Sequence, residues 1–228
     1  MKIPKPTVDY RSFRPSKLNT DEFRHLKLLI YWPVFGILFF MLEKVIPWDY
    51  YYPMHCSFDD LIPFNEWFVF PYIFWFVYLI GIHVYTLLYD IPAFKRLMCF
   101  IILTYSAALV IYIMFPNCQN MRPAEFERDN ILTRFMADYY SFDTHTNVCP
   151  SLHVIGSVAV MTCALNMECF KTPLWRTFFI CVTVLISIST VFLKQHSVMD
   201  IVAALPICFM AYFPAYVELP SRKRLRPE

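Results

Sequence analysis

Glycine is scarce in this sequence, with three residues in 228, and no glycine-rich P-loop is present. The eight cysteines form neither a CxxC pair nor a Cys/His ligand pattern, which argues against a zinc site. The first residues lack the short apolar run and small-residue cleavage site of a signal peptide. We therefore expect no bound metal or other cofactor, and no nucleic-acid partner.

Apolar residues, in contrast, dominate the composition. Hydrophobic residues make up 58% of the chain and aromatic residues 19%, and the mean hydropathy is +0.45. A soluble domain of this size could not bury so much apolar surface. The composition therefore predicts an integral membrane protein with a single membrane domain.

Six apolar segments are each roughly long enough to cross a bilayer, which takes about 20 residues of helix. We expect an all-α, polytopic membrane protein in which six transmembrane helices form a helical bundle around the catalytic core. The segments are 27–46, 67–89, 95–115, 151–168, 174–193 and 198–217. The predicted organisation is a basic tail at 1–25, a membrane catalytic domain at 26–218 and a second basic tail at 219–228.

The distribution of Lys and Arg predicts the orientation, because cytoplasmic loops carry an excess of these residues. Most of the 20 basic residues fall on one side if the N-terminus is cytoplasmic. Both termini are then expected in the cytoplasm. The loops at 47–66, 116–150 and 194–197 would share the extracytoplasmic or lumenal face.

Three cysteines lie in or near these outer loops: Cys56, Cys118 and Cys149. An oxidising compartment would allow two of them to form a disulfide. Three cysteines cannot all pair with one another, and three free thiols are the alternative.

The stretch from Asn147 to His153 leads from the longest outer loop into an apolar segment. Pro150 fits the first turn of a helix, which would place Ser151 and His153 beside backbone N–H groups that lack partners. A helix start of this kind favours an anion, and the hydroxyl and the imidazole add side-chain donors. The stretch thus predicts a phosphate site. The alternative is a capping serine with an interfacial histidine.

His196 and Asp200 are spaced i, i+4, so on a helix they would share one face and touch. A carboxylate that holds one imidazole nitrogen leaves the other free as a nucleophile or a base. The alternative is an interfacial ion pair. Lys194 is one of few basic residues on this side, and a lysine at a helix end can also simply extend towards the surface.

Arg122 falls on the same predicted face as these histidines. Two histidines, a serine and two cations on one side of a membrane suit phosphoryl transfer. Cations and helix N–H groups would hold the phosphate oxygens, one imidazole would attack phosphorus, and the other would protonate the leaving oxygen.

The sequence also resembles the type-2 phosphatidic acid phosphatase superfamily of lipid phosphatases and phosphotransferases, over about residues 95–205. The motifs of that family are K-x6-R-P, P-S-G-H and S-R-x5-H-x3-D. Residues 115–123 have the spacing of the first motif and its R-P end, at Arg122 and Pro123. Residues 150–153 read PSLH, and residues 189–200 read STVFLKQHSVMD. The resemblance implies a six-helix core, no metal requirement and a covalent phosphohistidine.

The resemblance also implies a role for each matching residue. His196 would be the nucleophile, Asp200 its orienting partner and His153 the general acid. Arg122 and Ser151 would bind the substrate phosphate.

Three positions depart from the family motifs. Phe115 stands where the family has Lys, Thr190 where it has Arg, and Leu152 where it has Gly. A leucine at this glycine position is also tolerated in the PSLH-containing branch of the family, whose members resemble inositol phosphorylceramide synthases. The other two departures remove phosphate-binding cations, and the loss of those cations leaves a catalytically dead member as an alternative.

Lys194 lies four residues after Thr190, so one helical turn would place it on the same face. We predict that Lys194 replaces a missing phosphate-binding cation. Arg128 and Arg134 are alternatives for the other cation, although solvent-facing positions suit them equally well. Asn147, in the polar lead-in Asp143-x3-Asn147, is expected to position the loop at the phosphate.

The expected function is a metal-independent membrane phosphatase that hydrolyses a lipid phosphate monoester or pyrophosphate through a phosphohistidine. The alternative is a phosphotransferase that moves a phospho-head group onto a lipid alcohol, as a sphingolipid synthase does. A non-catalytic membrane protein such as a transporter ranks below both, because it would not need two histidines on one face. The expected partners are the bilayer and a lipid phosphate.

Overall fold

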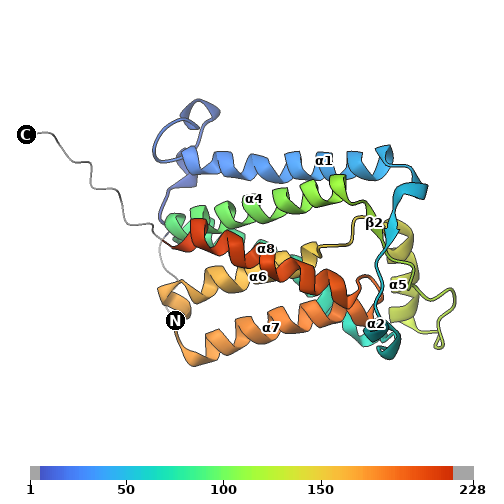
Figure 1. Cartoon of the computed structure of the whole chain (residues 1–228). Helices are drawn as coiled ribbons and strands as arrows, with labels where there is room; N and C mark the ends of the chain where they lie inside the picture. Colours follow the sequence, from blue (N-terminus) through green and yellow to red (C-terminus); the bar gives the residue numbers. More distant parts are fainter. Residues whose placement is uncertain (1–5, 218–228) are drawn as a thin grey trace, which may run out of the picture.

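The computed structural model describes residues 6–217, and within them the fold is almost entirely helical (Figure 1). Six longer helices form the body: α1 (Tyr31–Val45), α3 (Val69–Tyr89), α4 (Ile91–Met114), α6 (Leu152–Leu165), α7 (Pro173–Phe192) and α8 (Val198–Tyr216). The loops add the short helices α2 (Ser57–Leu61) and α5 (Ile131–Phe142), and the two-residue strands β1 (Tyr52–Pro53) and β2 (Asn117–Cys118). The remaining helical turns are 3-10: Tyr10–Ser12, Pro15–Lys17, Arg24–Ile30, Trp48–Tyr50, Glu66–Phe68 and Glu168–Phe170.

Five helical stretches are long and apolar enough to cross a membrane: Arg24–Val45, Glu66–Tyr89, Ile91–Met114, Pro173–Phe192 and Val198–Tyr216. The prediction of an all-α, polytopic membrane protein is confirmed. The apolar segment predicted at 151–168 forms a shorter helix, α6, of 14 residues. At about 1.5 Å per residue α6 reaches about 21 Å, less than the hydrocarbon core of about 30 Å.

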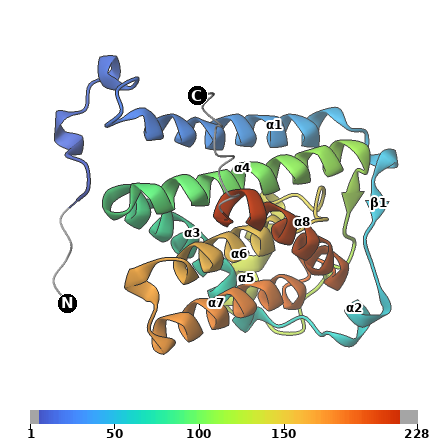
Figure 2. The same ribbon diagram turned by 60° about the vertical axis from the view of Figure 1, so that its left-hand side comes forward.

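Helix α6 lies at the centre of the bundle and packs against α3, α4, α7 and α8 (Figures 1 and 2). Small side chains on a membrane helix allow its neighbours to approach closely. Gly156 does so here, because a Cβ atom at this position would lie 2.9 Å from the Tyr105 hydroxyl and 3.0 Å from Trp75 Nε1. The centre of the bundle therefore holds α6, and the chain segment that enters α6, in a fixed place.

Local signals in the sequence account for the helix starts. Asp90 accepts a hydrogen bond from the backbone N–H of Ala93 at the start of α4, at 2.9 Å, and Thr172 caps α7 in the same way. Ser197 and Asp200 form a capping box at the start of α8. Such caps satisfy N–H groups that have no partner inside the helix.

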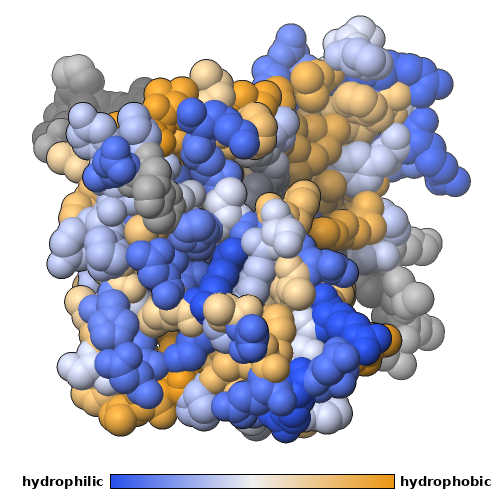
Figure 3. All heavy atoms as spheres, turned by 90° about the vertical axis from the view of Figure 1, so that its right-hand side faces the viewer, coloured by the Kyte–Doolittle hydropathy of each residue, from blue (hydrophilic) through white to orange (hydrophobic). Residues whose placement is uncertain are grey.

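The outer loops meet at one end of the bundle, where α2, α5 and the two strands lie (Figure 1). β1 pairs in parallel with β2, so that Tyr52 lies opposite Asn117, and Cys118 bridges to Thr146. Polar side chains gather on this end face (Figure 3). α8 ends at the opposite end, and the three loops that the charge distribution assigned to one face therefore do lie together. Their assignment to the extracytoplasmic or lumenal side stays a prediction.

The described part of the predicted N-terminal tail packs against the bundle. The Tyr10 hydroxyl contacts His25 Nε2 at 2.7 Å and donates to the Leu87 carbonyl at 2.7 Å. Phe23 and His25 are buried. Residues 1–5 and the predicted C-terminal tail at 219–228 lie outside the described residues.

The eight cysteines are free thiols in this structure. Of the three in the outer loops, Cys118 and Cys149 are buried and Cys56 is half-buried. The structure thus has the free-thiol alternative and not a disulfide.

Candidate active site

Ser151 is the N-cap residue of α6. Its side chain caps the helix by accepting from the Val154 N–H at 3.4 Å, and its own N–H donates to the Asp200 carbonyl at 3.2 Å. Pro150 precedes the cap, so its predicted place in the first helical turn is wrong. Serine is preferred at the cap because its oxygen can accept from the free N–H groups, and the helix begins after it. The fully buried Ser151 thereby ties α6 to α8.

His196 and Asp200 are in contact, with His196 Nδ1 3.0 Å from Asp200 Oδ2. They do not share one helix as predicted, because α8 begins at Val198, after the histidine. The same Asp200 oxygen also accepts from the Ser197 N–H at 3.0 Å, and this capping bond aims the carboxylate back at His196. We assign the proton to Nδ1, which then donates to the fully buried Asp200 side chain and leaves Nε2 of His196 with a free lone pair.

His153 lies next to His196, with the ring centroids 5.8 Å apart. Its ring stacks on Tyr72 at 4.5 Å and lies 4.4 Å from Trp75. The Nε2 atom of His153 is buried and has no hydrogen-bond partner among the described residues. These aromatic contacts fix the ring while leaving one nitrogen for a ligand.

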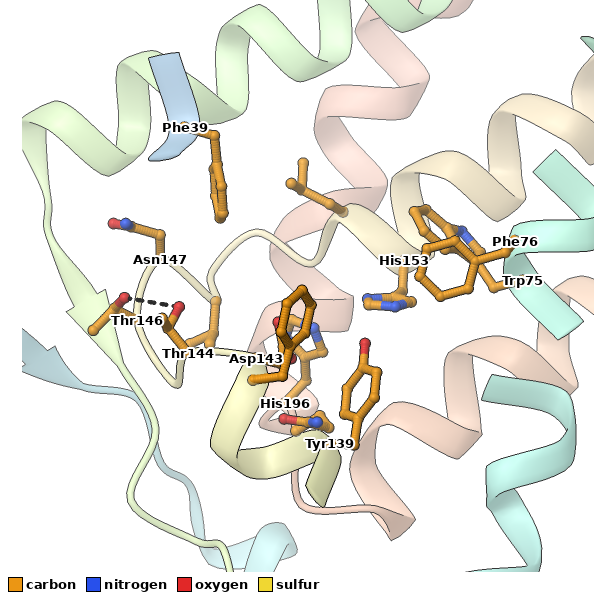
Figure 4. A pocket seen from close by; sticks show the side chains of 14 residues that line it. Phe39, Trp75, Phe76, Tyr139, Asp143, Thr144, Thr146, Asn147, His153 and His196 are labelled. Carbon is orange, nitrogen blue, oxygen red and sulfur yellow. Dashed lines mark hydrogen bonds between the residues drawn. The ribbon is translucent and has the colours of Figure 1, made fainter. Parts of the chain in front are cut away.

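The two histidines line a cavity of about 250 Å³ (Figure 4). Aromatic side chains from α1, α3 and α5 line much of it: Phe39, Trp75, Phe76, Tyr139 and Phe142. Asp143 and Gln195 complete the polar part of the lining that lies near His196. The cavity combines an imidazole pair with an apolar wall, which suits the head group of a lipid.

Arg122, predicted to bind phosphate, is engaged with the chain around the cavity. Its guanidinium donates to three carbonyls that follow or end α5, those of Tyr140, Asp143 and Thr144, at 2.9 to 3.0 Å. It also donates to Gln195 Oε1 at 2.6 Å. Arg122 is not among the residues that line the cavity.

Gln195 is a site residue that the sequence did not reveal. Because Arg122 can only donate, it must face the amide oxygen, and the Nε2 group of Gln195 then points away from it. That Nε2 atom is buried and has no partner among the described residues. Gln195 lines the cavity beside His196, so its N–H group is available to a phosphoryl oxygen. Its position between Lys194 and His196 was the only signal in the sequence.

Lys194 does not join the histidines. α7 ends at Phe192, and Lys194 follows it in a left-handed conformation, with φ of 52°. The helical turn that was expected to stack Lys194 on Thr190 is therefore absent. Its ammonium donates to the carbonyls of Asp59 and Ile62, at 2.8 and 2.5 Å.

The two positions that lack the family cations, and the two arginines named as alternatives, make other contacts. The Thr190 hydroxyl donates to the Ser187 carbonyl inside α7, and the Phe115 ring lies 5.4 Å from that of Tyr52. Arg128 is paired with Glu66 at 2.9 Å, and Arg134 with Asp129 at 2.7 Å.

Asn147 reaches the cavity, but its side chain points away from the two histidines (Figure 4). Its backbone is left-handed, with φ of 54°, and its N–H donates to the Asn117 carbonyl at 2.6 Å. The buried side chain of Asn117 brackets Cys149, donating to its carbonyl at 2.8 Å and accepting from its N–H at 2.7 Å. Asn117, which sequence reasoning missed, thus fixes the entry into α6.

A buried carboxylate holds the turn that carries His196. Asp59, on α2, accepts from the Ser197 hydroxyl at 2.6 Å and from the Val198 N–H at 2.8 Å, and also from the Cys56 N–H. Burial alone raises the pKa of Asp59, but these hydrogen bonds outweigh it and the net shift is downwards. An ionised Asp59 therefore clamps the start of α8 from the first outer loop.

Replacing Asp59 by alanine should lower the free energy of unfolding by about 3 kcal/mol, because it leaves the buried Ser197 hydroxyl and Val198 N–H unpaired. The measurement is thermal unfolding of the purified protein in detergent. Asp60→Ala is the matched control, since Asp60 is the next residue and its carboxylate contacts the exposed His55. Equal melting temperatures for the two variants would contradict the clamp.

Asp143 is a carboxylic acid in the lining of the cavity. Burial raises the pKa of this carboxyl to about 6, and the positive charge of Arg122 opposes the rise. Asp143 Oδ2 lies 3.8 Å from the guanidinium of Arg122. Asp143 is therefore mostly ionised at pH 7, next to an arginine whose charge it balances.

The chain was compared with protein families, curated proteins and solved structures. No curated protein and no solved structure matches it. The model of the PAP2 superfamily matches residues 96–223. The matched region runs from α4 to the end of the fold and includes both histidines, Asp200, Arg122 and Gln195. The chain therefore belongs to the PAP2 superfamily, whose members are generally phosphatases and phosphotransferases.

Proposed function

We propose that this protein is a membrane enzyme that cleaves a phosphate ester of a lipid through a phosphohistidine on His196. The observation that carries the proposal is the pair of imidazoles in one cavity, one of them oriented by Asp200 at 3.0 Å and the other packed against aromatic rings. A histidine oriented by a carboxylate is an activated nucleophile, and a second imidazole within the same cavity is placed for proton transfer.

The first step uses the free Nε2 lone pair of His196. It attacks phosphorus, while His153 gives a proton to the leaving lipid oxygen. Asp200 stabilises the positive charge that develops on the His196 ring. The N–H of Gln195 and the free N–H groups at the start of α6 face the charge on the phosphoryl oxygens.

In the second step His153 takes a proton from the acceptor, which attacks the phosphohistidine and frees His196. With water as the acceptor the protein is a phosphatase acting on a lipid phosphate, which is the first candidate. The aromatic wall of the cavity favours a second candidate, in which a lipid alcohol is the acceptor and the protein is a phosphotransferase.

Purified protein in detergent with EDTA, incubated with lipids labelled at phosphorus, tests the proposal. We expect transfer of label to the protein within the first turnover, in a bond that is labile to acid and stable to alkali, as in a phosphohistidine. Release of a water-soluble labelled product without added acceptor would identify the phosphatase. Transfer of the label to added diacylglycerol or ceramide, giving a new labelled lipid, would identify the transferase, and an absence of labelled protein with every lipid would overturn the proposal.

A further inference from the structure

The charges in and around the cavity bear on which lipid it can hold. Among the described residues that line it, none is Lys or Arg. Arg122 donates from its two Nη atoms to backbone carbonyls and to Gln195, and Asp143 lies 3.8 Å from its guanidinium. Lys194 is bound to the α2 loop. A phosphate monoester with nearly two negative charges would therefore meet no lysine or arginine in the described lining of the cavity.

The charge that does face the cavity is negative. Asp143 lines the cavity, and its side chain is 39% exposed, whereas that of Arg122 is 14% exposed. Figure 4 shows Asp143 among aromatic side chains, with Tyr139 and His196 nearby. The faces of aromatic rings attract an ammonium group, and a carboxylate adds a direct charge. The wall beside the histidines thus suits a cation.

We propose that the substrate is a zwitterionic phosphodiester lipid whose head group carries an ammonium, as in a choline or ethanolamine phospholipid. This inference rests on the proposed function and names its substrate class. The single negative charge of the phosphodiester lies between His196 and His153 and accepts from Gln195 Nε2. The ammonium lies against Asp143 and the rings of Tyr139 and Phe142. The net charge of the ligand is then zero, so the ligand does not depend on a lysine or arginine in the lining.

The reaction follows from this placement. The Nε2 of His196 forms a bond to phosphorus, and the bond from phosphorus to the glycerol oxygen breaks. The electron pair goes to that oxygen, which takes the proton from His153, and diacylglycerol leaves. The phosphohistidine keeps the ammonium head group as an ester. The acceptor hydroxyl then attacks phosphorus and gives its proton to His153, and the P–N bond breaks with its electron pair returning to His196.

Three lipids with the same acyl chains separate the alternatives: phosphatidylcholine, phosphatidylglycerol and phosphatidic acid. We expect the wild type to have its highest kcat/KM, and its fastest labelling of His196, with phosphatidylcholine or its ethanolamine counterpart. Asp143→Asn keeps the size of the side chain and removes its charge. It should lower kcat/KM for phosphatidylcholine about tenfold and raise it for phosphatidic acid.

Asp138→Asn is the matched control, because Asp138 is exposed on α5, the helix that ends just before Asp143, and does not line the cavity. It should leave the ranking of the three lipids unchanged. A wild type that prefers phosphatidic acid or phosphatidylglycerol would overturn the inference, as would an equal loss on all three lipids in Asp143→Asn. If a phosphohistidine forms with phosphatidic acid alone, the proposed function stands and this inference fails. If none forms with any lipid, both fail.

Discussion

His196→Ala is expected to lower turnover of any lipid substrate by roughly 10⁴-fold or more, because it removes the atom that forms the covalent intermediate in the proposed mechanism. His196 Nε2 is the free end of an imidazole whose other nitrogen is held by Asp200. Removing the ring leaves the cavity and the hydrogen bonds of Ser197 to Asp59 and Asp200 in place. Asp200 loses one partner but keeps the Ser197 N–H, so the variant should stay folded with only a small fall in melting temperature, while losing both turnover and the acid-labile phosphorus label.

The matched control is His55→Ala. His55 also contacts an aspartate, with its Nε2 2.8 Å from Asp60, at the same end of the bundle. That pair is exposed and does not line the cavity with His153. His55→Ala should keep wild-type turnover. Labelled protein in His196→Ala, or an equal loss in the two variants, would show that a His–Asp contact alone does not identify the nucleophile.

The fold was largely predictable from the sequence because membrane helices follow one strong rule, a run of apolar residues long enough for the bilayer. Each predicted segment contains a helix within a few residues of the expected limits. The exception is α6, which is shorter than the segment predicted at 151–168, because apolar residues continue in the sequence after the helix has ended. Asn166 ends α6, and its side chain donates to the Thr162 carbonyl. Hydropathy alone does not register a polar residue that turns the chain in this way.

The candidate site was predictable where it depends on short spacing. His196 and Asp200 meet as expected, although through a capping box and not along one helix. Lys194 shows the limit of the same reasoning. Its distance from Thr190 in sequence suggested a shared helical face, but the helix ends at Phe192 and the lysine turns to the α2 loop.

The residues that hold the site in place come from distant parts of the chain and left no local signal. Asp59 clamps Ser197 across 138 residues, and Asn117 brackets Cys149 across 32. Their side chains are buried hydrogen-bond partners of backbone and hydroxyl groups, which are costly to leave unpaired. A single sequence shows such residues only as polar positions in loops. Their function appears once the three outer loops are seen to meet.

His153→Gln tests the second imidazole through the chemistry of the leaving group. With a lipid substrate the leaving alkoxide is a strong base and needs a proton. Loss of the general acid should therefore lower the rate of the first step, formation of the phosphohistidine, by about 10²- to 10⁴-fold. A p-nitrophenyl ester with the same head group releases a stable phenolate that needs no proton. For that ester, the rate of the first step in His153→Gln should be within about tenfold of the wild-type rate, because only the protonation of the leaving group has been removed.

The second step still needs His153 to take a proton from the acceptor. With the p-nitrophenyl ester, His153→Gln should therefore release one equivalent of nitrophenolate rapidly and then stall as a phosphohistidine. Rapid-mixing absorbance measures this burst, and the acid-labile label measures the stalled intermediate. His196→Ala provides the contrast, since it should show no burst with either substrate. An equal slowing of both substrates in His153→Gln would mean that the ring, stacked on Tyr72 and Trp75, supports the cavity without transferring a proton. A burst with the nitrophenyl ester alone would assign the leaving-group proton to His153, and the nucleophile would then be the imidazole that Asp200 orients.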